Sequence, residues 1–418
     1  MLIGKVKSEL FAPTFPEDRL DANCFNLIVF DLCFLPLFPL FSVSLTLPVI
    51  VYWYYKRNKY FSQNIEHRYF KNIIIIMILS TFISLIYWSD MVQLETTFVT
   101  SVKRFFQYLT SFWLYYLLYY FFYKYKRNIS NIIFWALLNI LVYALIYTYN
   151  QELFISLKQT LCPFDPQVAR WLDNTLPVYR FNYLWADPNN VAYAISGLSA
   201  FYLVESSKES VIRKYIAIIV TSFVLITTMS IGGIAVFGAI LGFIACFTTK
   251  LRGSKKAICI GVVMIIIIIN FIGYYWDFFY EILESGLLKR TEIYGDDGLK
   301  GGGGRLHDLL RGLNYFNPMF FLVGSGKEGF VTEIGHIYIS YMYGIPVYIF
   351  FIYILFRKRY RQTLVEYMPI IPFFVAFTIN IAIIEQKVLL FLILFSAYYS
   401  AKCKHKCEDR KQLIRAAQ

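Results

Sequence analysis

Long apolar runs are the sequence feature that most constrains the fold of this chain. Runs of about 18 or more apolar residues, the length that crosses roughly 30 Å of hydrocarbon, recur along its 418 residues. Hydrophobic residues make up 58% of the chain and charged residues only 16%, whereas a soluble domain is usually about a quarter charged. The sequence therefore predicts an all-α polytopic membrane protein, with residues 1–418 forming a single integral membrane domain.

The number of predicted helices depends on the first apolar run, 26–55. Pro36, Pro39 and Pro48 interrupt this run and favour two short helices over one tilted helix. Residues 215–247 are too long for one span and have Ser230-Ile231-Gly232-Gly233 at their centre, which indicates a tight helical hairpin. The remaining apolar runs predict one span each: 72–88, 104–123, 129–149, 189–204, 257–276, 336–356, 369–383 and 388–401. About twelve transmembrane helices result, or eleven if the first run forms one helix.

Basic residues gather between alternate predicted spans and set the orientation. The six clusters are 56–71, 124–127, 208–214, 250–256, 357–361 and 402–415. Placing all of them in the cytoplasm gives one consistent topology with both termini cytoplasmic. The net charge of +13 then reports topology, and nucleic acid is not expected as a partner.

Two long polar segments interrupt the apolar runs and fall on the outer side in this topology. We name residues 150–187 loop one and residues 277–335 loop two. Connections of this length are usually functional. Loop two holds nine acidic and six basic residues, so its arginines are not part of a general basic coat. The two loops are expected to form an active site at the outer face.

Loop two and the span after it supply two candidates for chemistry. Arg305 directly follows four glycines and opens a helical pattern, a position suited to binding an anion. It could equally pair with Asp308 on the surface. His336 begins the next predicted span, where its near-neutral pKa would let it accept a proton from a hydroxyl. A histidine at that boundary could also simply cap or snorkel.

Loop one ends in a charged and aromatic segment. Asp187 and Pro188 are expected to be the N-cap and the first residue of the next helix. Arg180 would then lie just above the membrane, beside Tyr183 and Trp185. Exposed aromatic rings next to an arginine suit sugar stacking and phosphate contact, although they also fit an interfacial belt.

The succession of these motifs resembles the bacterial O-antigen polymerase and O-antigen ligase superfamily. The motifs are, in order, Arg180 with Asp187-Pro188-Asn189, then Arg290 and Arg305 in loop two, then Asn317-Pro318, Gly324-Ser325-Gly326, His336 and Gly344. Each motif is short, so the specificity lies in their order and in the surrounding hydropathy. The resemblance covers most of the chain, from about residue 129 onward.

The resemblance implies a GT-C-like membrane glycosyltransferase of the bacterial inner membrane that acts at the periplasmic face. Its substrate would be an oligosaccharide carried on undecaprenyl pyrophosphate, and no cofactor or metal would be needed. Arg180, Arg290 and Arg305 would hold the donor pyrophosphate, and His336 would orient or deprotonate the acceptor hydroxyl. The remaining substrate-binding candidates are Tyr183, Trp185, Asn189, Gly324 and Gly326. Expected partners are membrane lipid and a chain-length regulator and flippase of the same pathway.

Two departures from the family pattern bear on which member the chain resembles. Ile337 follows His336, where ligases often have asparagine, and this favours a polymerase that joins repeat units. The central hairpin has Ser230-Ile231-Gly232 where the family often has Ser-Arg-Gly. A ligase that transfers finished polymer to lipid A core stays an alternative. A lipid-linked oligosaccharide flippase is the alternative of a different class, but it would be expected to carry charges within its spans, where Asp31 is one of few.

The C-terminal cysteines add one minor candidate. Cys403-Lys404-His405-Lys406-Cys407 offers three soft ligands in a basic segment, which is a weak metal motif. A solvated, lipid-facing basic tail is the favoured interpretation.

Overall fold

Every element of regular secondary structure in the described part of the chain is helical. The structure is a computed structural model, and it describes residues 16–36, 46–61, 71–80, 82, 98–163, 165–174, 179–206, 211–247, 322, 324, 334–356, 363–379 and 385–417. No strand occurs in these ranges, which confirms the all-α fold class. Arg290, Arg305 and Gly326, like nearly all of loop two and the predicted span 257–276, lie outside the described residues.

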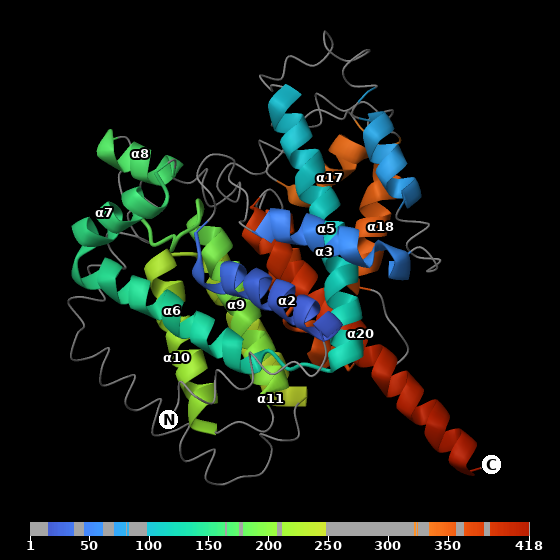
Figure 1. Cartoon of the computed structure of the whole chain (residues 1–418). Coiled ribbons are helices and arrows are strands. Elements are labelled where there is room, and N and C mark those ends of the chain that lie inside the picture. The colour runs from blue at the N-terminus through green and yellow to red at the C-terminus, as the bar shows by residue number, and fades with distance from the viewer. Residues whose placement is uncertain are drawn as a thin grey trace.

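Figure 1 shows the described helices along the chain. Their order is α2 (Pro16–Phe34), α3 (Thr46–Phe61), α5 (Phe98–Tyr125), α6 (Ser130–Tyr149), α7 (Gln151–Leu161), α8 (Pro166–Leu172), α9 (Pro188–Glu205), α10 (Val211–Thr228), α11 (Ile231–Phe247), α17 (Gly335–Tyr343), α18 (Ile345–Phe356), the short 3-10 helix η2 (Leu364–Tyr367), α19 (Ile371–Ile379) and α20 (Gln386–Ala417). Residues Lys71–Ser80 form a further short apolar helix. Two of the described helices, α6 and α10, are long and apolar enough to cross a membrane by length and composition.

Two predicted helix breaks are confirmed. The first apolar run forms two helices, α2 and α3, and Pro36 lies just beyond the end of α2. The predicted hairpin forms α10 and α11, and the break between them falls at Met229 and Ser230. Met229 adopts a φ of 52°, a left-handed conformation that an α-helix cannot continue through.

Two expectations for the C-terminal half are wrong. The predicted single span 336–356 is two helices, α17 and α18, because Gly344 between them has a φ of 86°. The predicted solvated basic tail begins instead as part of the packed helix α20, in which Cys403 is buried and Lys402 and Lys406 are paired with acidic residues. Figure 1 shows the last turns of α20 projecting beyond the rest of the described helices.

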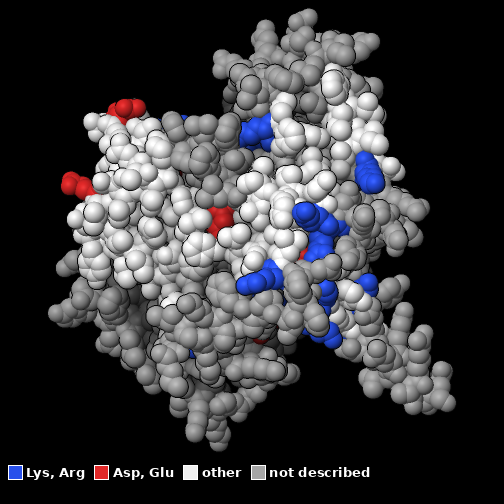
Figure 2. All heavy atoms as spheres, in the orientation of Figure 1, with Lys and Arg blue, Asp and Glu red and all other residues white. Residues whose placement is uncertain are grey.

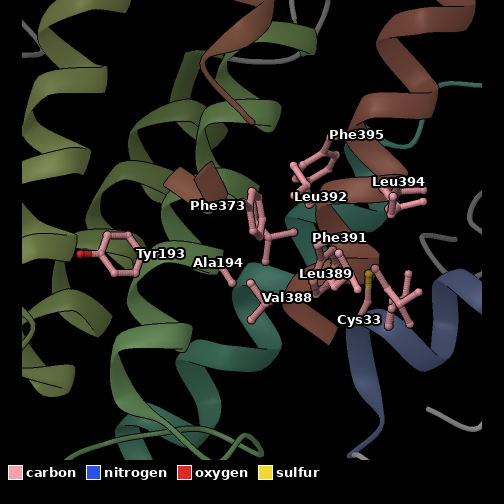
Figure 3. Packing of buried hydrophobic residues seen from close by; sticks show 14 of the residues in the cluster. Cys33, Tyr193, Ala194, Phe373, Val388, Leu389, Phe391, Leu392, Leu394 and Phe395 are labelled. Carbon is pink, nitrogen blue, oxygen red and sulfur yellow. The ribbon is translucent and has the colours of Figure 1, made fainter. Parts of the chain in front are cut away.

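The core of the bundle is built around α20. The hydroxyl of Tyr115 on α5 donates to Ser400 Oγ over 3.1 Å, and rings of the two helices pack along one another. On its other side α20 faces α9 and α19, and Figure 3 shows Phe373 of α19 reaching between Ala194 of α9 and Phe395 of α20. The Phe373 and Phe395 ring centroids are 5.8 Å apart. This apolar centre gives the surrounding helices a common support.

The basic segment at the end of α20 is anchored by acidic residues from two other elements. Lys402 Nζ lies 2.7 Å from Glu205 Oε2 and 3.1 Å from Glu366 Oε1. Lys406 Nζ also bonds to Glu366, over 2.6 Å. Burial alone would raise the pKa of Glu366, but the two lysines outweigh it and the pKa is lowered. The first part of the predicted tail is therefore a packed, ion-paired helix.

Candidate functional site

Arg180 joins the end of loop one to the break between α10 and α11. Its Nε donates to the carbonyl of Thr228 over 2.9 Å, and its Nη2 donates to the carbonyl of Met229 over 3.3 Å and to Asn189 Oδ1 over 3.2 Å. The carbonyls at a helix C-terminus lack intrahelical donors and carry partial negative charge. The guanidinium therefore covers the C-terminus of α10 and fixes it against the first turn of α9.

The first turn of α9 forms as predicted. Asp187 is the N-cap and its carboxylate accepts from the Asn189 backbone N–H over 2.6 Å, with Pro188 at the first helical position. Ser230 Oγ donates to Asn189 Oδ1 over 3.0 Å, so this amide oxygen accepts from Ser230 and from Arg180. The structure thus brings together two predicted site residues, Arg180 and Asn189, and adds Ser230 from the predicted hairpin.

Tyr183 and Trp185 are buried, which corrects the expectation that they are exposed. Each is 2% exposed, and Tyr183 accepts at its hydroxyl a hydrogen bond of 2.7 Å from Asn139 on α6. The two rings pack edge to face, with centroids 6.0 Å apart. Loop one folds back onto the helices instead of standing above them, so these rings present no surface on which a sugar can stack.

A buried ion pair that the sequence analysis missed holds loop one in this position. Lys158 of α7 is fully buried, and its Nζ lies 2.8 Å from Asp165 Oδ2 and donates to the Trp185 carbonyl over 2.8 Å. Burial lowers the pKa of Lys158, and the nearby Asp165 carboxylate opposes this shift. Asp165 also caps α8, which begins at Pro166. The sequence signal for the Asp165 cap is the Asp-Pro pair at 165–166, which repeats the pair at 187–188 that caps α9.

A buried carboxyl group lies beneath loop one, in the turn before α20. Burial raises the pKa of Glu385 to about 7, and Asp187 and Asp165 add to the shift, whereas the Asn190 side-chain amide opposes it. The amide donates to Glu385 Oε2 over 3.4 Å, and Oε1 has no hydrogen-bond partner among the described residues. The sequence alone indicates no role for Glu385.

Asp31, the intramembrane charge that bears on the flippase alternative, is paired with Lys387 at the start of α20. Lys387 Nζ lies 3.7 Å from Asp31 Oδ1 and donates to the backbone carbonyls of Asp31 and Leu35 at the end of α2. Asp31 Oδ2 accepts from the backbone N–H of Thr46 at the start of α3. The pair joins α2, α3 and α20, and a structural role accounts for the charge.

His336 lies in a polar cluster formed by three helices. Its Nδ1 is 3.1 Å from the hydroxyl of Tyr348 on α18. Its Nε2 is 3.1 Å from Thr378 Oγ1 and 3.2 Å from the Phe374 carbonyl, both on α19. The Phe374 ring covers the imidazole at a centroid distance of 4.4 Å. Both ring nitrogens therefore have partners within the protein, a feature that the sequence alone did not indicate.

Gly324, at the end of loop two, packs against the corner between α17 and α18. A Cβ atom on Gly344 would lie 2.6 Å from the Leu322 carbonyl oxygen, and one on Gly324 would lie 2.6 Å from the Met342 carbonyl oxygen. Gly324 also has a positive φ, of 85°. Both positions therefore require glycine, and close backbone packing accounts for the motif residue Gly324.

Arg180 and His336 lie toward the same end of the bundle. Contacts between Asn190 and Glu385 and between Gly197 and Phe373 show that α9 and α19 run antiparallel. His336 touches α19 beyond Phe373, on the side toward Glu385, and therefore toward the start of α9. Among the described residues no three His, Cys, Asp or Glu side chains gather as a metal site. Searches of family models, curated proteins and solved structures find no match to this chain.

Proposed function

We propose that this chain is a membrane glycosyltransferase of the O-antigen polymerase type. It joins repeat units carried on undecaprenyl pyrophosphate at the periplasmic face of the bacterial inner membrane, with inversion at the anomeric carbon. The proposed architecture is GT-C-like, with about twelve transmembrane helices and loops one and two on the periplasmic side. Its proposed partners are membrane lipid and the chain-length regulator and flippase of the same pathway.

The observation that carries this proposal is that Arg180 and His336, which are far apart in the sequence, lie toward the same end of the helix bundle. Gly324, from the end of loop two, packs against Gly344, at the corner that follows the His336 helix. Arg180, from loop one, bonds to Asn189 at the start of α9. The end of loop one and the His336 helix with its Gly324 contact therefore lie toward one end of the bundle, which supports the common site that the resemblance implies.

Apolar side chains on the outward faces of the helices support a membrane location. Ile345, Ile349 and Tyr353 of α18 are 39%, 60% and 50% exposed and follow one another at intervals of four residues, on one helix face. Leu27 and Phe30 of α2 are more than half exposed. Contiguous exposed apolar surface of this kind indicates contact with lipid or with another protein.

The proposed chemistry divides between the arginines and the histidine. Arg290 and Arg305 would bind the pyrophosphate, since a guanidinium offers a planar pair of donors to phosphate oxygens. These charges would stabilise the leaving group as negative charge grows on it. His336 would take the proton of the acceptor hydroxyl. Arg180 would contribute from the opposite loop, where its bonds to α10 hold the guanidinium in place.

The decisive test is the surface polysaccharide of a strain that lacks this chain. A polymerase deletion leaves the lipopolysaccharide core with one repeat unit, whereas bare core indicates a lost ligase or flippase. Complementation with Arg290→Ala or Arg305→Ala is expected to restore no long polymer although the protein inserts normally. A matched control is Arg311→Ala, a loop-two arginine outside the proposed site. Long polymer with both site variants would disprove the pyrophosphate role of these arginines.

A further inference from the structure

The contact between His336 and Tyr348 depends on the corner between α17 and α18. In one continuous helix two residues twelve positions apart would be separated by roughly 18 Å along the axis. The Tyr348 hydroxyl is instead 3.1 Å from His336 Nδ1, because the chain turns at Gly344. The corner therefore places a phenol group on one specific nitrogen of the histidine.

The partners of His336 define which ring nitrogen carries the proton. The Phe374 carbonyl oxygen can only accept a hydrogen bond, so Nε2, 3.2 Å away, is the protonated nitrogen of the neutral ring. Nδ1 is then an acceptor, and the Tyr348 hydroxyl donates to it. The lone pair of the basic nitrogen thus points at Tyr348 and not at Thr378.

We infer that Tyr348 fixes the tautomer of His336 and is also a catalytic residue, which conveys the acceptor proton to His336. The inference rests on the proposed glycosyl transfer and extends it to the proton path. The acceptor hydroxyl passes its proton to the Tyr348 oxygen as the Tyr348 proton moves to His336 Nδ1. The acceptor oxygen bonds to the anomeric carbon, and the bond from that carbon to the lipid pyrophosphate breaks with its electron pair. His336 ends as imidazolium, still donating from Nε2.

Nitrogen NMR of ring-labelled histidine tests the tautomer without any activity. The chain has four histidines, His67, His307, His336 and His405, and the signal lost in His336→Asn identifies the one of interest. In the wild type at neutral pH we expect a protonated Nε2 and an unprotonated Nδ1. In Tyr348→Phe the Nδ1 resonance should shift toward that of a nitrogen without a hydrogen bond. A wild-type neutral ring that carries its proton on Nδ1 would overturn the inference.

Turnover of lipid-linked repeat units in detergent tests the proton path. Tyr348→Phe should lower kcat by about 10²-fold, the lower end of what general acid–base catalysis contributes, and leave the KM for the donor unchanged. Tyr353→Phe, the same substitution at a half-exposed position of α18, should match the wild type. Full turnover in Tyr348→Phe would also overturn the inference. A wild type that transfers no sugar would refute the proposed function instead, and the spectrum would still decide the role of Tyr348.

Discussion

Lys158 illustrates how single polar residues determine the shape of loop one. Its ammonium lies between the Asp165 carboxylate and the Trp185 carbonyl, in a position without exposure to solvent. A buried charge is tolerated only when it is paired and hydrogen-bonded. Because its two partners belong to the middle and the end of loop one, Lys158 closes the loop on itself. Arg180 is positioned by this closure together with the end of α10.

Removing the charge of Lys158 should destabilise the protein. Lys158→Met leaves the Asp165 carboxylate buried without its partner, and breaking a buried ion pair in this way costs about 3–5 kcal/mol. We expect a clear fall in the Tm of the protein in detergent, measured by intrinsic fluorescence during thermal unfolding. Lys71→Met, which removes an exposed lysine, is the control and should leave Tm unchanged. Equal Tm values for the two variants would contradict the structural role of Lys158.

Glu385 should make stability depend on pH. Its pKa is raised by burial from 4.5 to about 7, so the folded protein holds this proton more tightly than the unfolded chain does. Between pH 4.5 and 7 the folded state is then the more protonated one, and stability falls as pH rises. The loss is up to about 3 kcal/mol above pH 7.

The matched variant is Glu385→Gln, which keeps an acceptor oxygen for Asn190 and cannot ionise. Its stability, measured by chemical denaturation in detergent from pH 5 to pH 8, should lack the part of the decline that Glu385 contributes. The variant should consequently be more stable than the wild type at pH 8. Parallel pH profiles for the two proteins would disprove the raised pKa.

At the scale of elements, the corner between α17 and α18 determines which side chains meet at His336. Gly344 adopts a positive φ and lies against the Leu322 carbonyl. Any residue with a Cβ must relieve both the backbone strain and the overlap. A straight helix over 335–356 would carry Tyr348 away from His336. The corner is therefore a structural requirement of the polar cluster.

A comparison of two glycine variants tests this requirement. Gly344→Ala should destabilise the protein by about 1–3 kcal/mol through strain and overpacking. Gly242→Ala lies in the interior of α11, where a Cβ meets no atom within 4 Å, and should stabilise the helix by about 0.5–1 kcal/mol. Thermal unfolding of both variants distinguishes the two effects. A Gly344→Ala protein as stable as the wild type would show that the corner can be relaxed.

At the scale of the whole molecule, charge is distributed unevenly over the surface. On the face shown in Figure 2, Lys and Arg gather where α2, α3 and α5 meet, and acidic side chains lie at the end formed by α7 and α8. The acidic end formed by α7 and α8 thus lies apart from the basic side chains gathered around α2, α3 and α5. The positive-inside bias predicts that the basic clusters lie in the cytoplasm, and this orientation stays a prediction.

Cysteine labelling in cells tests the orientation. Thr160 of α7 and Lys56 of α3 are both exposed, and we expect Thr160→Cys to react with a membrane-impermeant maleimide from the periplasm. Lys56→Cys should react only after the inner membrane is opened. The native Cys162, near Thr160, is buried and should add little background. Labelling of Lys56→Cys in intact spheroplasts would reverse the proposed topology.

Local signals in the sequence determined the elements. Hydropathy and proline positions predicted the helical class, the separate helices α2 and α3, and the hairpin of α10 and α11. The Asp187 cap was predictable because an N-cap bonds within two or three residues of itself. These features follow from interactions between near neighbours in the chain, so they can be predicted from the sequence alone.

The tertiary structure alone decided what is buried and which residues meet. Lys158 and Trp185 are 27 positions apart, and Asn190 and Glu385 are 195 apart, so no local pattern links them. Tyr183 was expected to be exposed because its own segment is polar, but burial depends on the helices that pack against it. The prediction for His336 concerned one residue, whereas its protonation depends on Tyr348 and α19. Hydropathy is a local property of the sequence and determines which segments form helices. Packing between distant segments determines the environment of each side chain.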